Sequence, residues 1–349
     1  MGNVAGRSTV YNLITSPEKL SQVNVDNLEL ESDFLEYLQS IDRSPSTIKQ
    51  YKANLHVFWC WNLEYNKNKF FIDLTKREIA KFQNHCINEW GWSPRRIRTV
   101  KATLSSLSNF IESVLDDEYE GYRPIVRKIE SPANDAVREK SVFSDDELQP
   151  LLDELVESGD YIKACALSLA INSGRRKSEL PRFKVSYFNN ENLICSGALY
   201  KTPEKVVTKG RGSRGKQLVL YTLARPFQPY LELWLEERKR LGIDSDWLFP
   251  KRVGEDWLDE PIDISSLDSW AKTFSKKLCK PFYWHSMRHN LTTRLKEYNI
   301  PDSVIQDMIG WDSADMVKLY SDLSSDREFE KYFGAEGIKQ VNSRSLDDL

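Results

Sequence analysis

The stretch from Tyr283 to Leu323 places the strongest constraint on the fold. It carries His285, Arg288 and His289 at positions i, i+3 and i+4, which share one face if the segment is helical. His285 would lie near the start of that helix, where free backbone N–H groups and the helix dipole favour an anion. The pattern therefore predicts a helix whose N-terminal end binds a phosphate group.

The second half of this stretch predicts two further short helices. Pro301 interrupts the chain, and a new helix should extend from there to about Ile309, where Gly310 ends it as a C′ glycine. Trp311 follows, and Tyr320 lies nine residues further on. A last helix would carry the apolar residues Met316, Leu319 and Leu323 together with Tyr320.

These residues carry a resemblance to a known family. The sequence HSMRH at 285–289, followed by Gly310-Trp311 and Tyr320, resembles the second signature box of the tyrosine recombinases and phage integrases. Their first box, G-x-R-x-x-E-L, resembles GRRKSEL at 174–180. The resemblance extends over roughly residues 28–325. Arg175 stands where the family usually has an apolar residue, and the sequence offers no physical account of that difference.

The resemblance implies a nucleophilic role for Tyr320. A tyrosine hydroxyl has a pKa near ~10 and is a poor nucleophile unless cations stabilise the transition state at phosphorus. Arg176 and Arg288 are suited to bidentate contact with the non-bridging phosphate oxygens. His285 and the Trp311 indole N–H would each donate a further hydrogen bond. Because the arginines supply the positive charge, no metal and no cofactor is expected.

Three supporting roles are also implied by the resemblance. A lysine in the hairpin between the two boxes would protonate the departing 5′ hydroxyl. Lys209 matches this position best, and Lys201 is the alternative. Glu179 would orient neighbouring residues, and His289 would assist proton transfer or orient the site.

Charge distribution indicates a nucleic-acid partner more clearly than net charge does. The net charge is −3, which does not by itself point to nucleic acid. Two basic runs, however, contain no acidic residue, and the alternative for either run alone is an ordinary solvated face. The cations expected at DNA are Arg95, Arg96, Arg98 and Lys101 in one run, and Lys205, Arg211 and Arg214 in the other.

Helix caps and apolar periodicity predict a mainly α chain of two domains. Residues 1–27 are expected to be a flexible or partly ordered arm, 28–122 an all-helical domain like the core-binding, SAM-like domain of the family, and 123–140 a linker. Residues 141–325 would form a mostly helical catalytic domain with one small antiparallel β-sheet. Strands are expected at 192–195 and 218–221, around a hairpin at 201–216. N-caps are predicted at Ser44, Thr75, Ser93 and Ser144.

The sequence excludes several classes of protein and favours one activity. No apolar run reaches the length of a membrane span, and five scattered cysteines indicate free thiols in a reducing compartment. A cytoplasmic location is therefore expected, nucleoid-associated if the protein is bacterial or viral. The expected activity is site-specific DNA recombination through a 3′-phosphotyrosyl intermediate. The alternatives are a type IB-like topoisomerase, a telomere resolvase, or a DNA-binding factor without activity.

The expected partner is double-stranded DNA with paired recognition sites. We expect a monomer in free solution that assembles on DNA as dimers and then a tetramer. Phe329, Tyr332 and Phe333 have helical spacing, and a helix bearing three exposed aromatics needs a partner surface. In the family that the chain resembles, this segment often docks on a neighbouring protomer, so the tail at 326–349 is expected to dock there. The alternative is that it folds back on its own domain.

Overall fold

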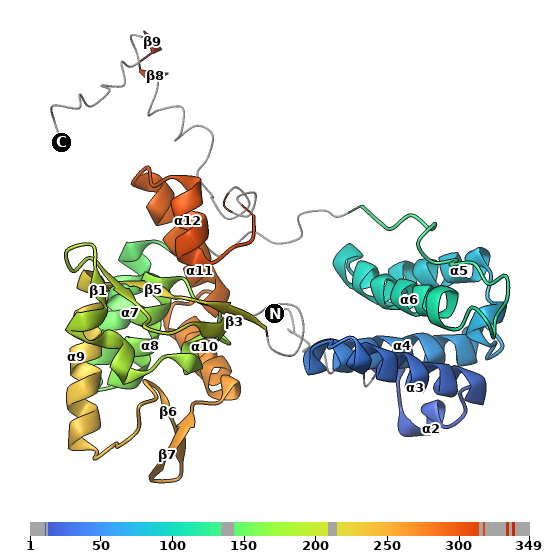
Figure 1. Cartoon of the computed structure of the whole chain (residues 1–349), viewed down its shortest axis with the longest axis horizontal. Helices are drawn as coiled ribbons and strands as arrows, with labels where there is room; N and C mark the ends of the chain where they lie inside the picture. Colours follow the sequence, from blue (N-terminus) through green and yellow to red (C-terminus); the bar gives the residue numbers. More distant parts are fainter. Residues whose placement is uncertain are drawn as a thin grey trace. The chain divides into compact units, whose positions relative to one another are not determined.

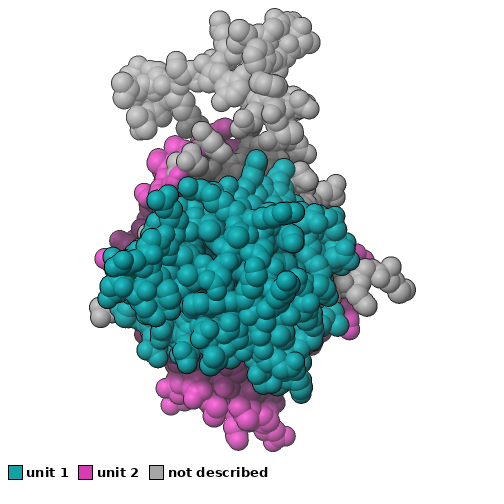
Figure 2. Space-filling view, turned by 90° about the vertical axis from the view of Figure 1, so that its right-hand side faces the viewer, with its two compact units in different colours: residues 1–139, 210–215 teal, residues 140–209, 216–349 magenta. Residues whose placement is uncertain are grey.

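The computed structural model describes residues 11, 13–133, 143–208, 215–313 and 317, and the backbone of 333–334 and 337–338. The chain divides into two compact units, with the main boundary at residues 139 and 140. Figure 1 labels their helices and strands, and Figure 2 colours the units differently. The mainly α fold with small antiparallel sheets confirms the predicted fold class.

The N-terminal unit is all-helical in its described residues. Its core contains the fully buried Phe34, Phe58 and Trp59. The predicted caps at Ser44 and Ser93 are confirmed, because each serine side chain accepts a hydrogen bond from the backbone three residues later. The helices are α2 (Pro17–Leu20), α3 (Val25–Ser40), α4 (Pro45–Tyr65), α5 (Lys76–Asn88) and α6 (Pro94–Val114), with a 3-10 turn η1 (Phe71–Asp73).

Of the two alternatives for the N-terminal arm, the ordered one holds for the described residues just before 28. Thr15 and Val23 are buried. Asn27 is fully buried: its Nδ2 donates to the Lys69 carbonyl at 2.9 Å, and its Oδ1 accepts from the Phe71 N–H at 2.9 Å. Hydrogen bonds to a segment more than forty residues away hold this part of the chain on the domain.

The expected linker is also incorporated into this unit up to residue 133. Val126 is buried in the helical core. Lys101 was expected to face solvent or DNA, but its side chain is buried, so this expectation is wrong. The Lys101 ammonium donates to the carbonyls of Ile129 at 2.8 Å and Glu130 at 3.1 Å, and to Ser131 Oγ at 3.0 Å. The amine therefore anchors the exit segment of the domain.

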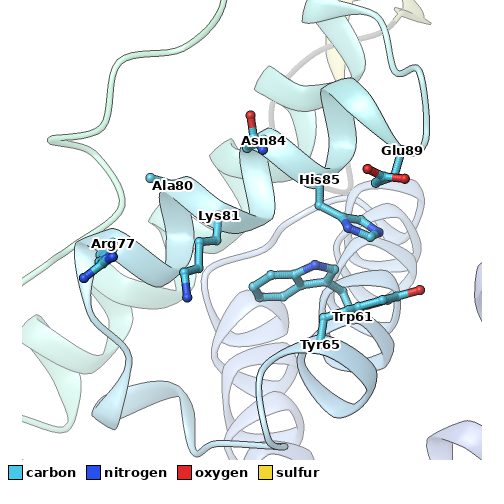
Figure 3. A pocket seen from close by; sticks show the side chains of 8 residues that line it. All are labelled: Trp61, Tyr65, Arg77, Ala80, Lys81, Asn84, His85 and Glu89. Atoms are coloured by element: carbon cyan, nitrogen blue, oxygen red, sulfur yellow. The ribbon is translucent and has the colours of Figure 1, made fainter.

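A surface pocket of about 460 Å³ lies between α4 and α5 (Figure 3). Trp61, Tyr65 and His85 form its aromatic part, with Arg77 and Lys81 at its edge. The His85 ring lies 4.5 Å from the Tyr65 ring, between centroids. Among the described residues of the two signature boxes, none lines this pocket.

The second unit is mostly helical, and its core contains Leu167, Phe227 and Phe249. Its helices are α7 (Asp145–Glu157), α8 (Tyr161–Ser173), α9 (Ala224–Arg240), α10 (Ile264–Lys277), α11 (Trp284–Glu297) and α12 (Asp302–Ile309). Short 3-10 turns occur at η2 (Leu180–Arg182), η3 (Val185–Phe188) and η4 (Asn190–Asn192). The predicted cap at Ser144 forms a capping box with Glu147, as Thr75 does with Glu78 in the first unit.

The strands of this unit form more than the one sheet that was predicted. β1 (Leu193–Ile194), β2 (Leu199–Lys201) and β5 (Tyr221–Leu223) form a three-stranded sheet, whereas β3 (Val206–Thr208) and β4 (Lys216–Leu218) pair only with each other. The expected strand at 218–221 is therefore split. The buried Leu220 lies at the split. Its carbonyl accepts a hydrogen bond from the Thr202 N–H, and its own N–H donates to Thr202 Oγ1.

Two short pairs of strands were not predicted. β6 (Pro250–Val253) and β7 (Asp256–Pro261) form an antiparallel pair, although both segments are charged and contain proline. β8 (Phe333–Gly334) pairs with β9 (Gly337–Ile338), so the expected terminal helix does not include Phe333. Phe329 and Tyr332 lie outside the described residues. Over the described ranges, no helix combines the length and apolarity needed to cross a bilayer.

Candidate active site

The first box begins where α8 ends. Residues 164–173 of this helix are all buried, and Gly174 then adopts a left-handed conformation with φ of 60°. A Cβ at Gly174 would lie 2.8 Å from Ile309 Cδ1 and 3.1 Å from Leu291 Cδ2. Glycine is therefore required both by the turn and by the close approach of α11 and α12.

Arg176 and Glu179 form a compact ion pair within this box. The Arg176 backbone N–H donates to Glu179 Oε2 at 3.1 Å, and Arg176 Nη1 donates to Oε1 at 2.9 Å. Burial alone raises the pKa of the Glu179 carboxyl, but the charges of Arg175 and Arg176 outweigh burial, so its pKa lies below the ordinary value. The Arg176 side chain is 28% exposed, which leaves a cationic surface next to a fixed carboxylate.

The second box begins on α11, which starts at Trp284 as predicted. Trp284 is buried and its indole N–H donates to the Leu267 carbonyl at 2.7 Å, which fixes the start of the helix. His285 is exposed and His289 is half-buried. Their ring centroids lie 5.3 Å apart with the rings perpendicular, so the two histidines share a face as predicted.

Arg288 joins the two boxes. It is fully buried, and its Nη1 donates to the Gly174 carbonyl at 3.1 Å while its Nη2 donates to the Ile309 carbonyl at 2.9 Å. Its guanidinium also lies 5.0 Å from the centre of the Trp311 ring. Burial of this cation was not predicted from the sequence. Its phosphate contact stays a prediction.

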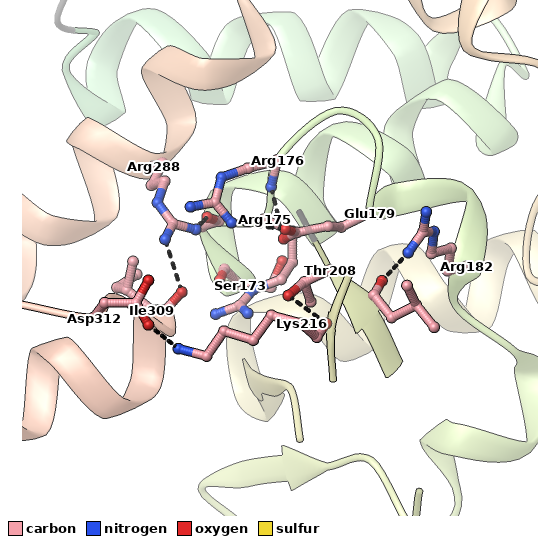
Figure 4. Close-up of polar contacts among 12 residues, drawn as sticks. Ser173, Arg175, Arg176, Glu179, Arg182, Thr208, Lys216, Arg288, Ile309 and Asp312 are labelled. Carbon is pink, nitrogen blue, oxygen red and sulfur yellow. Dashed lines mark hydrogen bonds and ion pairs between the residues drawn. The ribbon is translucent and has the colours of Figure 1, made fainter. Parts of the chain in front are cut away.

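Arg175 lies beside Arg288 and is also buried (Figure 4). Its Nε donates to the Ser173 carbonyl at 2.9 Å and its Nη2 donates to the Met308 carbonyl. Burial lowers the pKa of Arg175 to about 10, which still leaves the side chain charged at neutral pH. The structure thus gives the physical account of this arginine that the sequence lacked.

Trp311 follows a second left-handed glycine, Gly310, with φ of 77° at the end of α12. Trp311 is buried, and its backbone N–H donates to the Gln306 carbonyl at 3.0 Å. It packs in a cluster with Leu291 and Val317, and Val317 lies three residues before Tyr320. Trp311 is therefore part of a core cluster as well as a neighbour of Arg288.

The β3–β4 hairpin contacts the same turn through two residues that were not predicted as part of the site. Lys216 forms an ion pair with Asp312 (Figure 4), and the hydrogen bond from Lys216 lowers the pKa of Asp312. Leu218 packs on Gly310, since a Cβ there would lie 2.7 Å from Leu218 Cδ1. The only sequence signal for this contact is a lysine at the end of a basic run and an aspartate after Gly310-Trp311.

Several predicted site residues lie outside the described residues: Lys209, Arg211, Arg214 and Tyr320. Thr208, which precedes Lys209, is buried, and its hydroxyl donates to the Lys216 carbonyl at 2.9 Å. Lys201 is exposed at the end of β2, where it pairs with Tyr221. The choice between Lys209 and Lys201 therefore stays a prediction.

The remaining predicted DNA contacts differ in their surroundings. Arg95 and Lys205 are exposed. Arg96 donates to Asn54 Oδ1 at 2.7 Å and lies over the Trp92 ring, at 4.9 Å from its centre. Arg98 donates to the Pro132 carbonyl at 2.7 Å from an exposed position.

Family profiles match both units. A profile of the phage integrase family matches residues 141–327, and a profile of the phage integrase N-terminal SAM-like domain matches residues 30–121. The chain belongs to the phage integrase family. This confirms the tyrosine recombinase identification made from the two boxes, and the chain is a DNA strand-cleaving and rejoining enzyme of that family.

Two curated relatives are similar over most of the chain. The SPbeta prophage-derived recombinase-like protein YomM of Bacillus subtilis is 31% identical over 68% of this chain and 71% of its own length. The tyrosine recombinase XerS of Streptococcus thermophilus is 22% identical over 84% of this chain and 92% of its own length. These relatives are named as recombinases or recombinase-like.

Solved structures share the fold of this tyrosine recombinase. XerH recombinase bound to a palindromic difH substrate superposes with a TM-score of 0.62, at 17% identity, over 81% of this chain and 78% of that one. A lambda integrase dimer bound to a COC′ core site superposes with a TM-score of 0.58, at 16% identity, over 84% of this chain and 94% of that one. At these identities the likeness concerns the fold.

Proposed function

We propose that this tyrosine recombinase carries out site-specific exchange of DNA strands with Tyr320 as its nucleophile. The Tyr320 oxygen attacks a phosphodiester, forms a 3′-phosphotyrosyl bond and releases a 5′ hydroxyl. A 5′ hydroxyl from another duplex then attacks that bond and releases the tyrosine. The energy of the broken phosphodiester is kept in the covalent bond, so the cycle uses no ATP.

One observation carries this proposal: Arg288, a residue of the second signature box, is hydrogen-bonded to the first box and to the end of α12. Its donors reach the Gly174 carbonyl, 114 residues away in the sequence, and the Ile309 carbonyl. This links the turn that bears Arg176 to the end of α12 that leads to Trp311. Residues that match separate motifs are thereby brought into one site of the second unit.

The residues divide the work as follows. Arg176 and Arg288 hold the non-bridging oxygens as charge develops on them, with His285 and the Trp311 indole as further donors. Glu179 keeps Arg176 in place through the two hydrogen bonds described above. Two further roles rest on the resemblance: His289 beside His285 for proton transfer, and Lys209 or else Lys201 as the general acid. The charge distribution supports double-stranded DNA along the two basic runs, with the buried Lys101 left out.

Replacing Tyr320 by phenylalanine tests the chemistry. The variant should bind DNA normally and form no covalent adduct on a nicked suicide substrate, because only the nucleophilic oxygen is removed. Tyr298→Phe is the matched control, since Tyr298 is 77% exposed at the end of α11. A covalent adduct in Tyr320→Phe would refute the assignment of Tyr320 as the nucleophile. If the unaltered protein forms no adduct, the result would indicate a DNA-binding factor without activity.

Product analysis separates recombination from related chemistry. A pair of recognition sites on one plasmid should yield recombined products. Relaxation of a supercoiled plasmid without recombination would indicate a type IB-like topoisomerase, and hairpin ends would indicate a telomere resolvase. We propose a cytoplasmic location, associated with the nucleoid if the protein is bacterial or viral.

We further propose that the protein is a monomer when free and assembles on DNA as dimers and then a tetramer. Support comes from lambda integrase, which has been solved as a dimer on a core site and as a tetramer on a Holliday junction. Residues 326–340 would dock on a neighbouring protomer. Truncation after Ser325 should spare binding to a single half-site and weaken cooperative binding to paired sites. Unchanged cooperativity in a gel-shift titration would refute docking in trans.

A further inference from the structure

Two helix ends lie close together in the candidate site. α8 ends at Ser173 before Gly174, and α12 ends at Ile309 before Gly310, both glycines being left-handed. The last carbonyls of a helix lack partners within the helix and carry the negative end of its dipole. Two such ends in proximity repel each other unless cations lie between them.

Arg175 and Arg288 are the cations at this point. Arg175 donates to one carbonyl on each side, Ser173 and Met308. Arg288 does the same with Gly174 and Ile309. Each arginine therefore bridges the α8 end and the α12 end, and both are at most 1% exposed.

The two arginines differ in what else they touch. Arg288 contacts Trp311 and belongs to the second signature box, whereas Arg175 donates only to backbone carbonyls within the part of the chain that the structure describes. Arg175 also lies against the Gly310 turn, because its Nη1 is 3.8 Å from where a Gly310 Cβ would be. Glu179, itself 1% exposed, supplies negative charge that stabilises the buried guanidinium.

We propose that Arg175 is a positioning residue for strand cleavage: it holds the end of α12, and with it Gly310 and Trp311, at a fixed distance from Arg176. Arg176 is its covalent neighbour, so any shift of the Arg175 bridge changes the spacing between the two boxes. A displacement of about 1 Å in a site of this kind can slow a reaction by about 100-fold. The catalytic part of this inference rests on the proposed function.

Arg175→Met in the full chain is the main test, and Arg238→Met is its matched control. Arg238 on α9 is also a buried arginine bound to backbone carbonyls, those of Ser245, Trp247 and Leu248, and none of these residues belongs to the site. Both variants lose a buried cation and leave carbonyls without donors, so both should lower thermal stability. Only Arg175→Met should change the site.

The decisive measurement is single-turnover cleavage of a suicide substrate at saturating DNA, well below the unfolding temperature. Arg175→Met should cleave about 10-fold or more slowly with DNA affinity unchanged within about two-fold, whereas Arg238→Met should cleave at the normal rate. Equal cleavage rates in the two variants would overturn the proposal. If Arg175→Met does not fold, Arg175→Lys and Arg238→Lys decide in the same way.

Hydrogen exchange keeps this inference distinct from the proposed chemistry. The amides of Gly310 and Trp311 donate to the Gln306 carbonyl at 2.8 and 3.0 Å. They should exchange faster in Arg175→Met than in Arg238→Met or the unaltered protein. If the unaltered protein forms no adduct, the proposed function fails while this exchange difference still supports positioning. Equal exchange in the two variants refutes it.

Discussion

Replacing Gly174 by alanine measures how tightly the two signature boxes are packed. The backbone at Gly174 has φ of 60°, and an alanine in this left-handed region costs about 1–2 kcal/mol. The added Cβ also lies 2.8 Å from Ile309 Cδ1 and 3.1 Å from Leu291 Cδ2. Both side chains are buried, so their movement disturbs a packed cluster and costs a further 1–3 kcal/mol or so.

Gly159 provides a control within the same unit. It has φ of 72°, and no atom lies within 4 Å of its hypothetical Cβ. Gly159→Ala should therefore lower the free energy of unfolding only by the cost of the left-handed backbone, which is about 1 kcal/mol once the lower entropy of the unfolded chain is included. Gly174→Ala should lose about 2–4 kcal/mol, the sum of both effects.

The assay is urea unfolding of the full chain, with the transition of the second unit followed for both variants. Both glycines belong to that unit, so the difference between the two free energies of unfolding isolates the steric contribution. We expect this difference to be about 1–3 kcal/mol. Equal losses in the two variants would show that the approach of Gly174 to α11 and α12 carries no energetic weight, and would refute the reasoning.

Three further predictions concern the leaving group, DNA contact and acid stability. Lys209→Ala should slow cleavage of ordinary DNA but not cleavage of a 5′-bridging phosphorothiolate substrate, because its thiolate leaves without a proton. If Lys201→Ala shows this pattern instead, Lys201 is the general acid. Arg95→Ala should reduce the salt slope of DNA binding by about 1, whereas Lys101→Ala should leave it unchanged because that ammonium is bound by the chain; equal slopes in the two variants would contradict this. Burial raises the pKa of Glu78, but bonds from Lys69 and Thr75 outweigh it and lower the pKa from 4.5 to about 2. The ionised Glu78 carboxylate therefore stabilises the fold above pH 4.5, and this contribution is lost as pH falls toward 2. The difference in free energy of unfolding between Glu78→Gln and the unaltered protein should shrink over that range. A difference that stays constant in urea unfolding would contradict this prediction.

The sequence by itself determined the elements whose cause is local. The caps at Ser44, Thr75, Ser93 and Ser144 were all predicted, because a cap joins a side chain to a backbone N–H only three residues away. The helix of the second box was also predicted, because the i, i+3, i+4 spacing of His285, Arg288 and His289 is a local pattern, although no side-chain hydrogen bond caps its start. The two boxes identified the family, because their residue types and spacing can be read directly from the sequence.

Only the tertiary structure decided which cations are buried. In the sequence nothing marks Lys101, Arg175 and Arg288 as buried, but in the fold each donates to backbone carbonyls. For Arg175 the distant acceptor lies 133 residues along the chain. Burying a guanidinium is costly unless acceptors meet it, and those acceptors exist only once α8 and α12 end side by side. No local pattern encodes that meeting, so the joining of the two boxes is a property of the fold.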